Sequence, residues 1–447
     1  MTYDAFLRRD GYSVAKYRKA LNASQYLSPD ELAALQWSRL LRIVRHAYDS
    51  SPFYRERFRR VGFEPEDLRS PEDLRRLPIL TKDDLRSSLD SMFATGFTAS
   101  NTIRKRTGGS TGVPVRVHMD YEAASQKRAA VERHDGWAGW RPGVPLAAVW
   151  GDTEKSLPWR QRLRNTLSSR ANYLDTLVFT EERLRAFLDY LCRSRVPVLM
   201  GHAHSVYRLA QFALSEGITP PVKAIITTAM SLSSEERTSI EEAFRASVFN
   251  RYGCEEVSLI ASECDRHSGL HVFAEGLLLE FQDNGYSGVP ARLIITDLLN
   301  FGLPLLRYDI GDYVVSSSSL CTCGRGLPLL KDVSGRVADF LYTPEGTPIF
   351  GISVLDTFVI HIAGVRQAQL EQLTLDSLVV RIVRNSDFSD ESLQQLEATL
   401  RRVFGPRMRW DVEYCEQIGL TPAGKYRFSI CRINEAQCSR SLMPGEQ

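Results

Sequence analysis

Thr107-Gly-Gly-Ser-Thr-Gly-Val-Pro114 is the stretch of this 447-residue sequence on which the fold prediction depends most. Its three glycines let backbone N–H groups approach and wrap a polyphosphate, and its three hydroxyls add further donors. The segment therefore predicts a phosphate-binding loop, although it lacks the Gly-Lys-Ser/Thr ending of a Walker A loop. A turn without function is the alternative, because glycine and serine dominate ordinary turns.

Around this loop, short apolar runs alternate with helical patterns between Arg104 and Asp339. Residues 196–200 and 224–228 are typical of strands, and residues 180–193 are typical of a helix. This alternation predicts an α/β fold with a mainly parallel sheet. The later strands follow one another more closely, which favours an added antiparallel or barrel-like part.

Two further regions flank this α/β region. Residues 1–100 carry helix-start signals such as Ser28-Pro-Asp-Glu31 and predict a helical lead-in. Residues 340–447 combine strand patterns with one amphipathic helical pattern and predict a small α+β domain. The expected division is a domain of residues 1–339 and a second of residues 340–447, with a hinge at Asp339.

Composition excludes several classes of protein. Hydrophobic residues make up 43% and charged residues 25% of the chain, as in ordinary globular proteins, and the net charge of +2 favours neither nucleic acid nor an anionic membrane as a partner. No apolar run is long enough for a membrane span, and no secretory signal begins the chain, so the expected location is cytoplasmic. Most of the eight cysteines are expected to be reduced.

Five segments, taken in order, resemble the adenylate-forming superfamily of acyl-CoA synthetases, and in particular its phenylacetate-CoA ligase and CapK-like branch. The resemblance covers nearly the whole chain and includes Ser51-Pro-Phe-Tyr-Arg55 and Leu77-Pro-Ile-Leu-Thr-Lys82. It implies a large N-terminal adenylation domain and a small mobile C-terminal lid. The five segments are residues 107–114, Asn250-Arg-Tyr-Gly-Cys-Glu-Glu256, Leu306-Arg-Tyr-Asp-Ile-Gly-Asp312, Ser334-Gly-Arg-Val-Ala-Asp339 and Gly419-Leu-Thr-Pro-Ala-Gly-Lys-Tyr-Arg427.

The resemblance implies a role for each of these segments in binding ATP. Tyr252 would stack on adenine, and Glu256 would hold the magnesium ion that bridges the phosphates, which suits a hard oxygen ligand. Asp312 and Arg336 would bind the ribose. The full set implied for the nucleotide is Thr107, Gly108, Gly109, Ser110, Thr111, Gly112, Ala229, Met230, Asn250, Tyr252, Gly253, Asp312 and Arg336.

Catalysis is assigned by the same resemblance to Lys425, Glu256, Thr107 and Thr111. Lysine is a mobile point charge that can follow the charge moving from the substrate carboxylate to the α-phosphate. The resemblance also makes Asp339 the pivot between the two domains. A lone lysine in a Gly-Pro loop would otherwise be a solvated surface residue.

Cys321-Thr-Cys323 forms a Cys-x-Cys knuckle, and Cys264 with His271 supplies a second pair of soft ligands. Four such ligands suit tetrahedral zinc in a closed structural site. His267 competes for the fourth position because Cys264-x-x-His267 also has metal-like spacing. The alternative is that the four side chains are reduced residues packed in the core.

The expected reaction is ATP-dependent activation of a carboxylic acid to an acyl-adenylate, followed by transfer to coenzyme A. An amine, a hydroxyl or a carrier-protein thiol is the alternative acceptor. A non-catalytic nucleotide-binding protein stays open, because five residues depart from the family pattern. These are Gly108, Ala229, Met230, Glu255 and Ala338.

The acid is not specified by any pattern in the sequence. Trp137, Trp140 and Trp150 lie in the region expected to approach the substrate, which favours an aryl acid. Aromatic residues are more often core than pocket, however.

Overall fold

The chain folds into two compact units in this computed structural model: residues 1–310 with 314–333, and residues 311–313 with 334–447. The predicted pivot, Asp339, lies outside the described residues, so the hinge stays a prediction. The structure describes residues 3–106, 115–150, 172–175, 180–230, 232–282, 291–336, 340–346, 348–350, 362–418 and 429–433.

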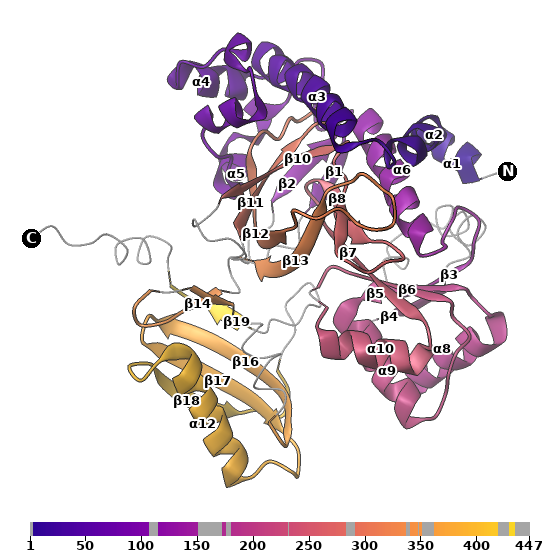
Figure 1. Cartoon of the computed structure of the whole chain (residues 1–447), viewed down its shortest axis with the longest axis vertical. Coiled ribbons are helices and arrows are strands. Elements are labelled where there is room, and N and C mark those ends of the chain that lie inside the picture. Colours follow the sequence, from indigo (N-terminus) through magenta and orange to yellow (C-terminus); the bar gives the residue numbers. More distant parts are fainter. Residues whose placement is uncertain are drawn as a thin grey trace, which may run out of the picture. The chain divides into compact units, whose positions relative to one another are not determined.

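The first unit begins with helices (Figure 1). Helix α3 starts at a capping box in which Ser28 accepts a hydrogen bond from the Glu31 backbone and the Glu31 carboxylate accepts one from Ser28. Thr81 and Asp84 cap α5 in the same way. The helices are α1 Tyr3–Arg9, α2 Val14–Ser24, α3 Pro29–Ser50, α4 Pro52–Arg60, η1 Pro65–Asp67, η2 Pro71–Arg76 and α5 Lys82–Met92.

A two-stranded antiparallel hairpin, β1 (Ile103–Arg106) with β2 (Arg116–Met119), follows the helices. The glycine-rich segment 107–114 connects its strands and lies outside the described residues. Helix α6 (Tyr121–Trp137) comes next, and it buries charged residues as well as apolar ones. It packs against α2, so the helical lead-in is attached to the α/β part of the unit.

An eleven-stranded sheet is the centre of the first unit, in the order β10-β11-β12-β13-β9-β8-β7-β6-β5-β3-β4. From β4 to β7 neighbouring strands are parallel, whereas β7, β8, β9 and β13 pair antiparallel, as do β10 and β11. The predicted α/β class is confirmed, and the added part contains these antiparallel pairs. The strands are β3 Leu146–Trp150, β4 Asn172–Asp175, β5 Val198–His202, β6 Ala224–Thr228, β7 Ser247–Cys254, β8 Ser258–Glu263, β9 Leu270–Val272, β10 Leu277–Gln282, β11 Ala291–Asp297, β12 Tyr308–Ser316 and β13 Leu329–Arg336.

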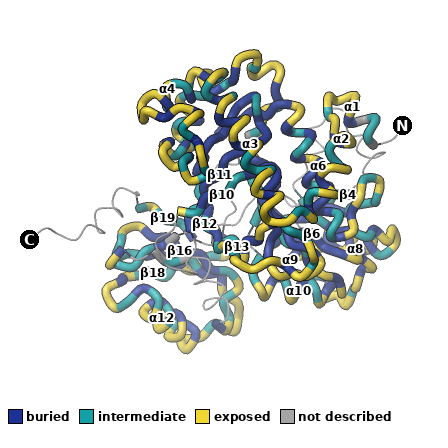
Figure 2. Tube along the Cα trace, turned by 45° about the horizontal axis from the view of Figure 1, so that its top comes forward, coloured by how far each residue is buried: buried dark blue, intermediate teal, exposed yellow. Residues whose placement is uncertain are grey.

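Helices α8 (Glu181–Ser194), α9 (Ala203–Ser215) and α10 (Ser234–Phe244) connect and cover the parallel strands. Figure 2 shows buried backbone along the strands and exposed residues on the outer faces of the helices. Among the described residues, no helix is both long and apolar enough to cross a membrane.

The second unit has its own core and a four-stranded sheet in the order β18-β17-β16-β19. The predicted amphipathic helix is α12, whose buried face carries Leu396, Leu400 and Phe404. Its elements are β14 Phe340–Tyr342, β15 Pro348–Phe350, β16 Val365–Thr374, β17 Ser377–Arg384, α12 Asp390–Phe404, β18 Arg409–Tyr414 and β19 Ser429–Cys431.

Candidate nucleotide and metal sites

Glu256 lies in the turn between β7 and β8 and is only 6% exposed. The hydroxyl of Tyr308, at the start of β12, donates a hydrogen bond of 3.1 Å to Glu256 Oε1. Burial, and then the charge of Glu256, raises the pKa of Tyr308 above its ordinary value, so the phenol stays a neutral donor. A buried carboxylate oriented by one donor, with acceptor capacity left over, is suited to a hard cation.

The residues before Glu256 are arranged by strand pairing. Asn250 on β7 pairs in register with Thr227 on β6, and the Thr227 hydroxyl donates to Asn250 Oδ1 at 3.5 Å. Gly253 sits against β8 so closely that a Cβ would lie 2.5 Å from the Ser258 carbonyl oxygen. Tyr252 is half-buried against the core of the first unit. A side chain at position 253 would therefore push β7 away from β8 next to the turn that carries Glu256.

Ala229 and Met230 follow β6 and are half-buried. Ala229 has a φ of 66°, the left-handed conformation that glycine adopts without strain. The turn therefore has a conformation that suits glycine, although the residue is alanine. Glu255, another departure, lies on the surface, where its carboxylate meets Lys105 Nζ at 3.3 Å.

Asp312 lies within β12 and is 5% exposed. Arg336 ends β13, and its side chain is not among those described. Their roles at the ribose stay predictions, as do those of the residues outside the described ranges. The latter are Thr107, Gly108, Gly109, Ser110, Thr111, Gly112, Asp339 and Lys425.

The four residues predicted as zinc ligands come together. The ligand atoms of Cys264, His271, Cys321 and Cys323 all lie within 4.8 Å of one another. The Sγ atoms of Cys264 and Cys321 are 3.7 Å apart, and Cys323 Sγ is 3.3 Å from His271 Nε2. The first distance is far too long for a disulfide bond.

These distances fit a tetrahedral zinc site. Zn–S bonds of about 2.3 Å and Zn–N bonds of about 2.0 Å give S···S edges of about 3.8 Å and S···N edges of about 3.5 Å. Burial lowers the pKa of His271 to about 4, so its imidazole is neutral at pH 7. Its Nδ1 lies 3.3 Å from the Leu327 carbonyl oxygen, and an N–H there leaves Nε2 free to coordinate.

His267, the competing ligand, is directed elsewhere. Its Nδ1 pairs with Glu263 Oε2 at 3.2 Å, and its ring lies 4.8 Å from that of Phe249. The geometry gathers His271 with the three cysteines and leaves His267 outside the group.

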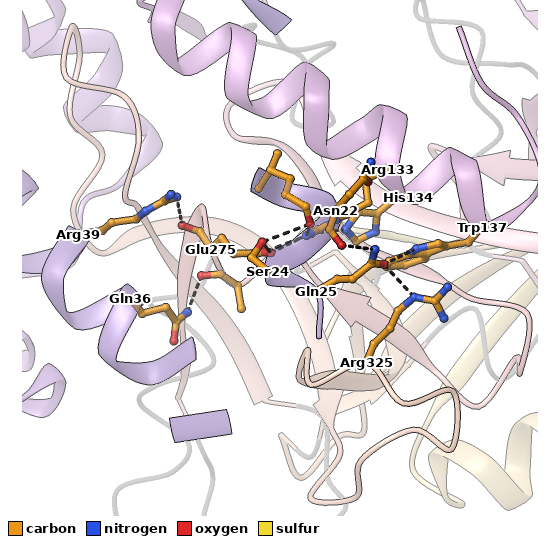
Figure 3. A network of polar contacts seen from close by, with 12 residues as sticks. Asn22, Ser24, Gln25, Gln36, Arg39, Arg133, His134, Trp137, Glu275 and Arg325 are labelled. Atoms are coloured by element: carbon orange, nitrogen blue, oxygen red, sulfur yellow. Dashed lines mark hydrogen bonds and ion pairs between the residues drawn. The ribbon is translucent and has the colours of Figure 1, made fainter. Parts of the chain in front are cut away.

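The polar network around Gln25, Trp137 and Arg325, next to the Cys/His cluster, was not predicted (Figure 3). Gln25, at the end of α2, accepts hydrogen bonds of 3.0 Å at Oε1 from both Trp137 and Arg325. The Gly326 N–H donates to the Gln25 carbonyl at 2.9 Å, and a Cβ on Gly326 would lie 1.8 Å from the Leu27 carbonyl oxygen. Gly326 lies three residues after the knuckle and could have been noticed, but nothing in the sequence connects Gln25 to a segment 300 residues away.

The three tryptophans expected near the substrate have different positions. Trp137 lies against the Cys/His cluster, with its ring 5.4 Å from that of His271. Trp140 is buried and packs with Val198 and Ile226. Trp150, which ends β3, lies 4.1 Å from the His202 ring at the end of β5. Packing thus largely explains the positions of Trp137 and Trp140, without a role at the substrate.

Comparison with known proteins identifies the family. The chain is 26% identical over 417 residues to the protein CapK of Staphylococcus aureus, covering 90% of each chain. It is 35% identical over 331 residues to a phenylacetate-coenzyme A ligase of Aromatoleum evansii, covering 70% of this chain and 72% of that one. The chain belongs to the phenylacetate-CoA ligase family. The predicted superfamily and its CapK-like branch are confirmed.

Two further comparisons concern the C-terminal residues and the fold. Residues 341–432 match the CapK C-terminal domain model. The fold resembles that of 2-hydroxyisobutyryl-CoA ligase, with a TM-score of 0.68 and 19% identity over 91% of this chain and 90% of that one. As a family member the chain is an acid-CoA-ligase-like, AMP-forming enzyme, whose acid and acceptor are not fixed by the relationship.

Proposed function

We propose that the protein activates a carboxylic acid with ATP and transfers the acyl group to coenzyme A. The observation that carries this proposal is the buried pair of Glu256 and Tyr308 in a phenylacetate-CoA ligase family member. In the first step a carboxylate oxygen attacks the α-phosphorus of ATP, and pyrophosphate leaves. In the second the thiol sulfur of coenzyme A attacks the acyl carbon, AMP leaves and the thiol proton is lost.

Each residue has a defined part in the proposed first step. Glu256 would hold Mg²⁺, which neutralises phosphate charge, and Tyr308 would keep the Glu256 carboxylate in place. Residues Thr107 to Gly112 would bind the phosphates, and Lys425 would stabilise the charge developing between carboxylate and α-phosphate. Asp312 and Arg336 would hold the ribose, and Tyr252 the adenine. Catalysis would rest mainly on positioning and charge neutralisation.

The Cys/His cluster would bind structural zinc and take no part in this chemistry. All four protein ligands are provided, and a closed tetrahedral site leaves no position for a substrate. Metal analysis of protein purified without a histidine tag is expected to give one zinc per chain. Less than half an equivalent would contradict the assignment.

A second acceptor deserves a test because of the C-terminal match. The CapK relative aligns over 90% of this chain and the A. evansii ligase over 70%, and the model matched at residues 341–432 is the CapK C-terminal domain. In the adenylate-forming superfamily the C-terminal domain moves between the two steps and admits the acceptor. An amine, hydroxyl or carrier-protein thiol is therefore the alternative to coenzyme A.

Acid-dependent ATP–pyrophosphate exchange tests the first step without requiring the acceptor. A panel of aryl and aliphatic acids would be screened with the full chain, Mg²⁺ and ATP. Exchange with any acid supports adenylation, and its absence with every acid would favour a non-catalytic nucleotide-binding protein. AMP release with coenzyme A, compared with release with a panel of primary amines, then distinguishes a thiol from an amine acceptor.

A further inference from the structure

A cavity of about 380 Å³ lies in the first unit, away from every residue assigned to ATP or zinc. Four segments line it: α2, α3, α6 and the chain after β11. Its volume is within the range of small-molecule sites. The lining residues that matter below are Tyr17, Arg39, Arg42, Leu298, Leu299 and Phe301.

The charge of this cavity is positive because neither of its two arginines forms an ion pair within 4 Å among the described residues. Lys16 and Glu122 also line it, but they form an ion pair of 2.9 Å, so their charges cancel. Within the described ranges, neither Arg39 nor Arg42 is within salt-bridge distance of a carboxylate. The nearby Glu275 carboxylate is bound by Arg133 through both of its oxygens. Two adjacent guanidinium groups without an ion-pair partner of their own favour an anion between them.

Arg39 is held in position by a hydrogen bond to the backbone of Glu275 (Figure 3). Its Nη1 donates to the Glu275 carbonyl oxygen at 2.5 Å, and Gln36 Nε2 donates to the carbonyl oxygens of Ala274 and Leu277, both at 2.8 Å. Burial lowers the pKa of Arg39; the charge of Glu275 opposes this effect, and the charge of Arg42 adds to it. The guanidinium is thus fixed before any ligand arrives, which reduces the entropic cost of binding.

The remaining walls are mostly apolar, with Gln126 as a further polar residue. Arg42 stacks on Phe301, with its guanidinium carbon 5.6 Å from the ring centroid, and Leu298 and Leu299 continue this surface. The hydroxyl oxygen of Tyr17 is buried and has no hydrogen-bond partner among the residues described. Because this oxygen is not accessible, Tyr17 offers the cavity its ring rather than its hydroxyl.

We propose that this cavity binds a small organic anion, with its carboxylate or phosphate between Arg39 and Arg42 and its apolar body against Leu298, Leu299 and Phe301. It would be a second ligand site, separate from the residues assigned to adenylation. A carboxylate ligand and a phosphate ligand would have the same two parts, an anionic head and an apolar or aromatic body. Phosphate and carboxylate heads are distinguished by the choice of probe.

The test is calorimetric titration of the full chain, without ATP, with phenyl phosphate, phenylacetate and inorganic phosphate. Phenyl phosphate or phenylacetate is expected to bind saturably and more tightly than inorganic phosphate. Arg42→Gln should weaken that binding about tenfold, since it removes one charge-assisted contact. Arg45→Gln is the matched control, because Arg45 lies on the same helix but pairs with Glu66 outside the cavity.

Three outcomes would overturn the proposal: no saturable binding of either organic probe, equal weakening by Arg42→Gln and Arg45→Gln, or inorganic phosphate binding as tightly as phenyl phosphate. Lys16→Gln provides a second variant at an exposed position, and it should change binding less than Arg42→Gln because Lys16 is already paired. Because ATP is absent, failure here is separate from failure of the ATP–pyrophosphate exchange assay.

Discussion

The Cys/His cluster and the Glu256 site lie in the same unit but differ in how completely the protein surrounds them. Each ligand of the cluster faces the other three, and the backbone N–H groups of Arg266 and Arg325 approach the sulfurs of Cys264 and Cys323 at 3.4 and 3.5 Å. Glu256 is buried but accepts one described hydrogen bond, from Tyr308. The closed Cys/His cluster is suited to stabilising the fold, and the incomplete Glu256 site is suited to a ligand that binds and dissociates in each catalytic cycle.

Removing the Glu256 carboxylate tests the incomplete site and should have the largest effect. Glu256→Gln keeps an acceptor for Tyr308 but loses the charge that would hold Mg²⁺, so acid-dependent pyrophosphate exchange should fall about 10²–10³-fold. Zinc content and the melting temperature should not change. Glu255→Gln, one residue away on the surface, should retain at least half the activity, and an equal loss in both variants would refute the assignment.

Breaking the closed site should affect stability. Cys323→Ser removes one ligand, and we expect loss of bound zinc and a decrease of about 3 kcal/mol in the free energy of unfolding, because metal binding is coupled to folding. Chelation of the unaltered protein should mimic this change. Cys192→Ser on α8 is the control. Unchanged zinc and unfolding in Cys323→Ser would mean that the four residues are only packed together.

The surroundings of the cluster offer a smaller test. Trp137→Phe keeps an aromatic ring near His271 but removes the hydrogen bond to Gln25, so denaturant unfolding should show a loss of about 1 kcal/mol with zinc retained. Trp140→Phe is matched to it, because the indole N–H of Trp140 is buried with no partner in the part of the chain that the structure describes. That variant should be neutral or slightly stabilising, and a larger loss than in Trp137→Phe would contradict the role given to Trp137.

The smallest effect is expected beside the incomplete site. Ala229→Gly removes the strain of a left-handed backbone conformation but increases the entropy of the unfolded chain. The free energy of unfolding should therefore rise by only about 0.5 kcal/mol. Denaturant unfolding would measure it, and Ala224→Gly, within β6, should instead destabilise. Destabilisation by Ala229→Gly would show that the turn is not strained.

The sequence predicted local features best. The α/β alternation, the helix α12 and the cysteine knuckle are set by periodicity and spacing within a few dozen residues, and the structure confirms the fold class. Tyr308 and Gln25 were missed because their partners, Glu256 and Arg325, lie 52 and 300 residues away, and only the folded chain brings them together. The glycine-rich loop and Lys425, which began the prediction, stay predictions.

The sequence separation between Cys264 and Cys321 would make folding of this part of the protein depend on zinc. A metal ion joining residues 57 positions apart would close a long loop, and the order β8-β9-β13 assembles around that closure. Newly made chains would then depend on the zinc supply to finish this part of the sheet. We expect the amount of protein in zinc-starved cells to fall through proteolysis of incompletely folded chains, before any change in the rate of the reaction itself.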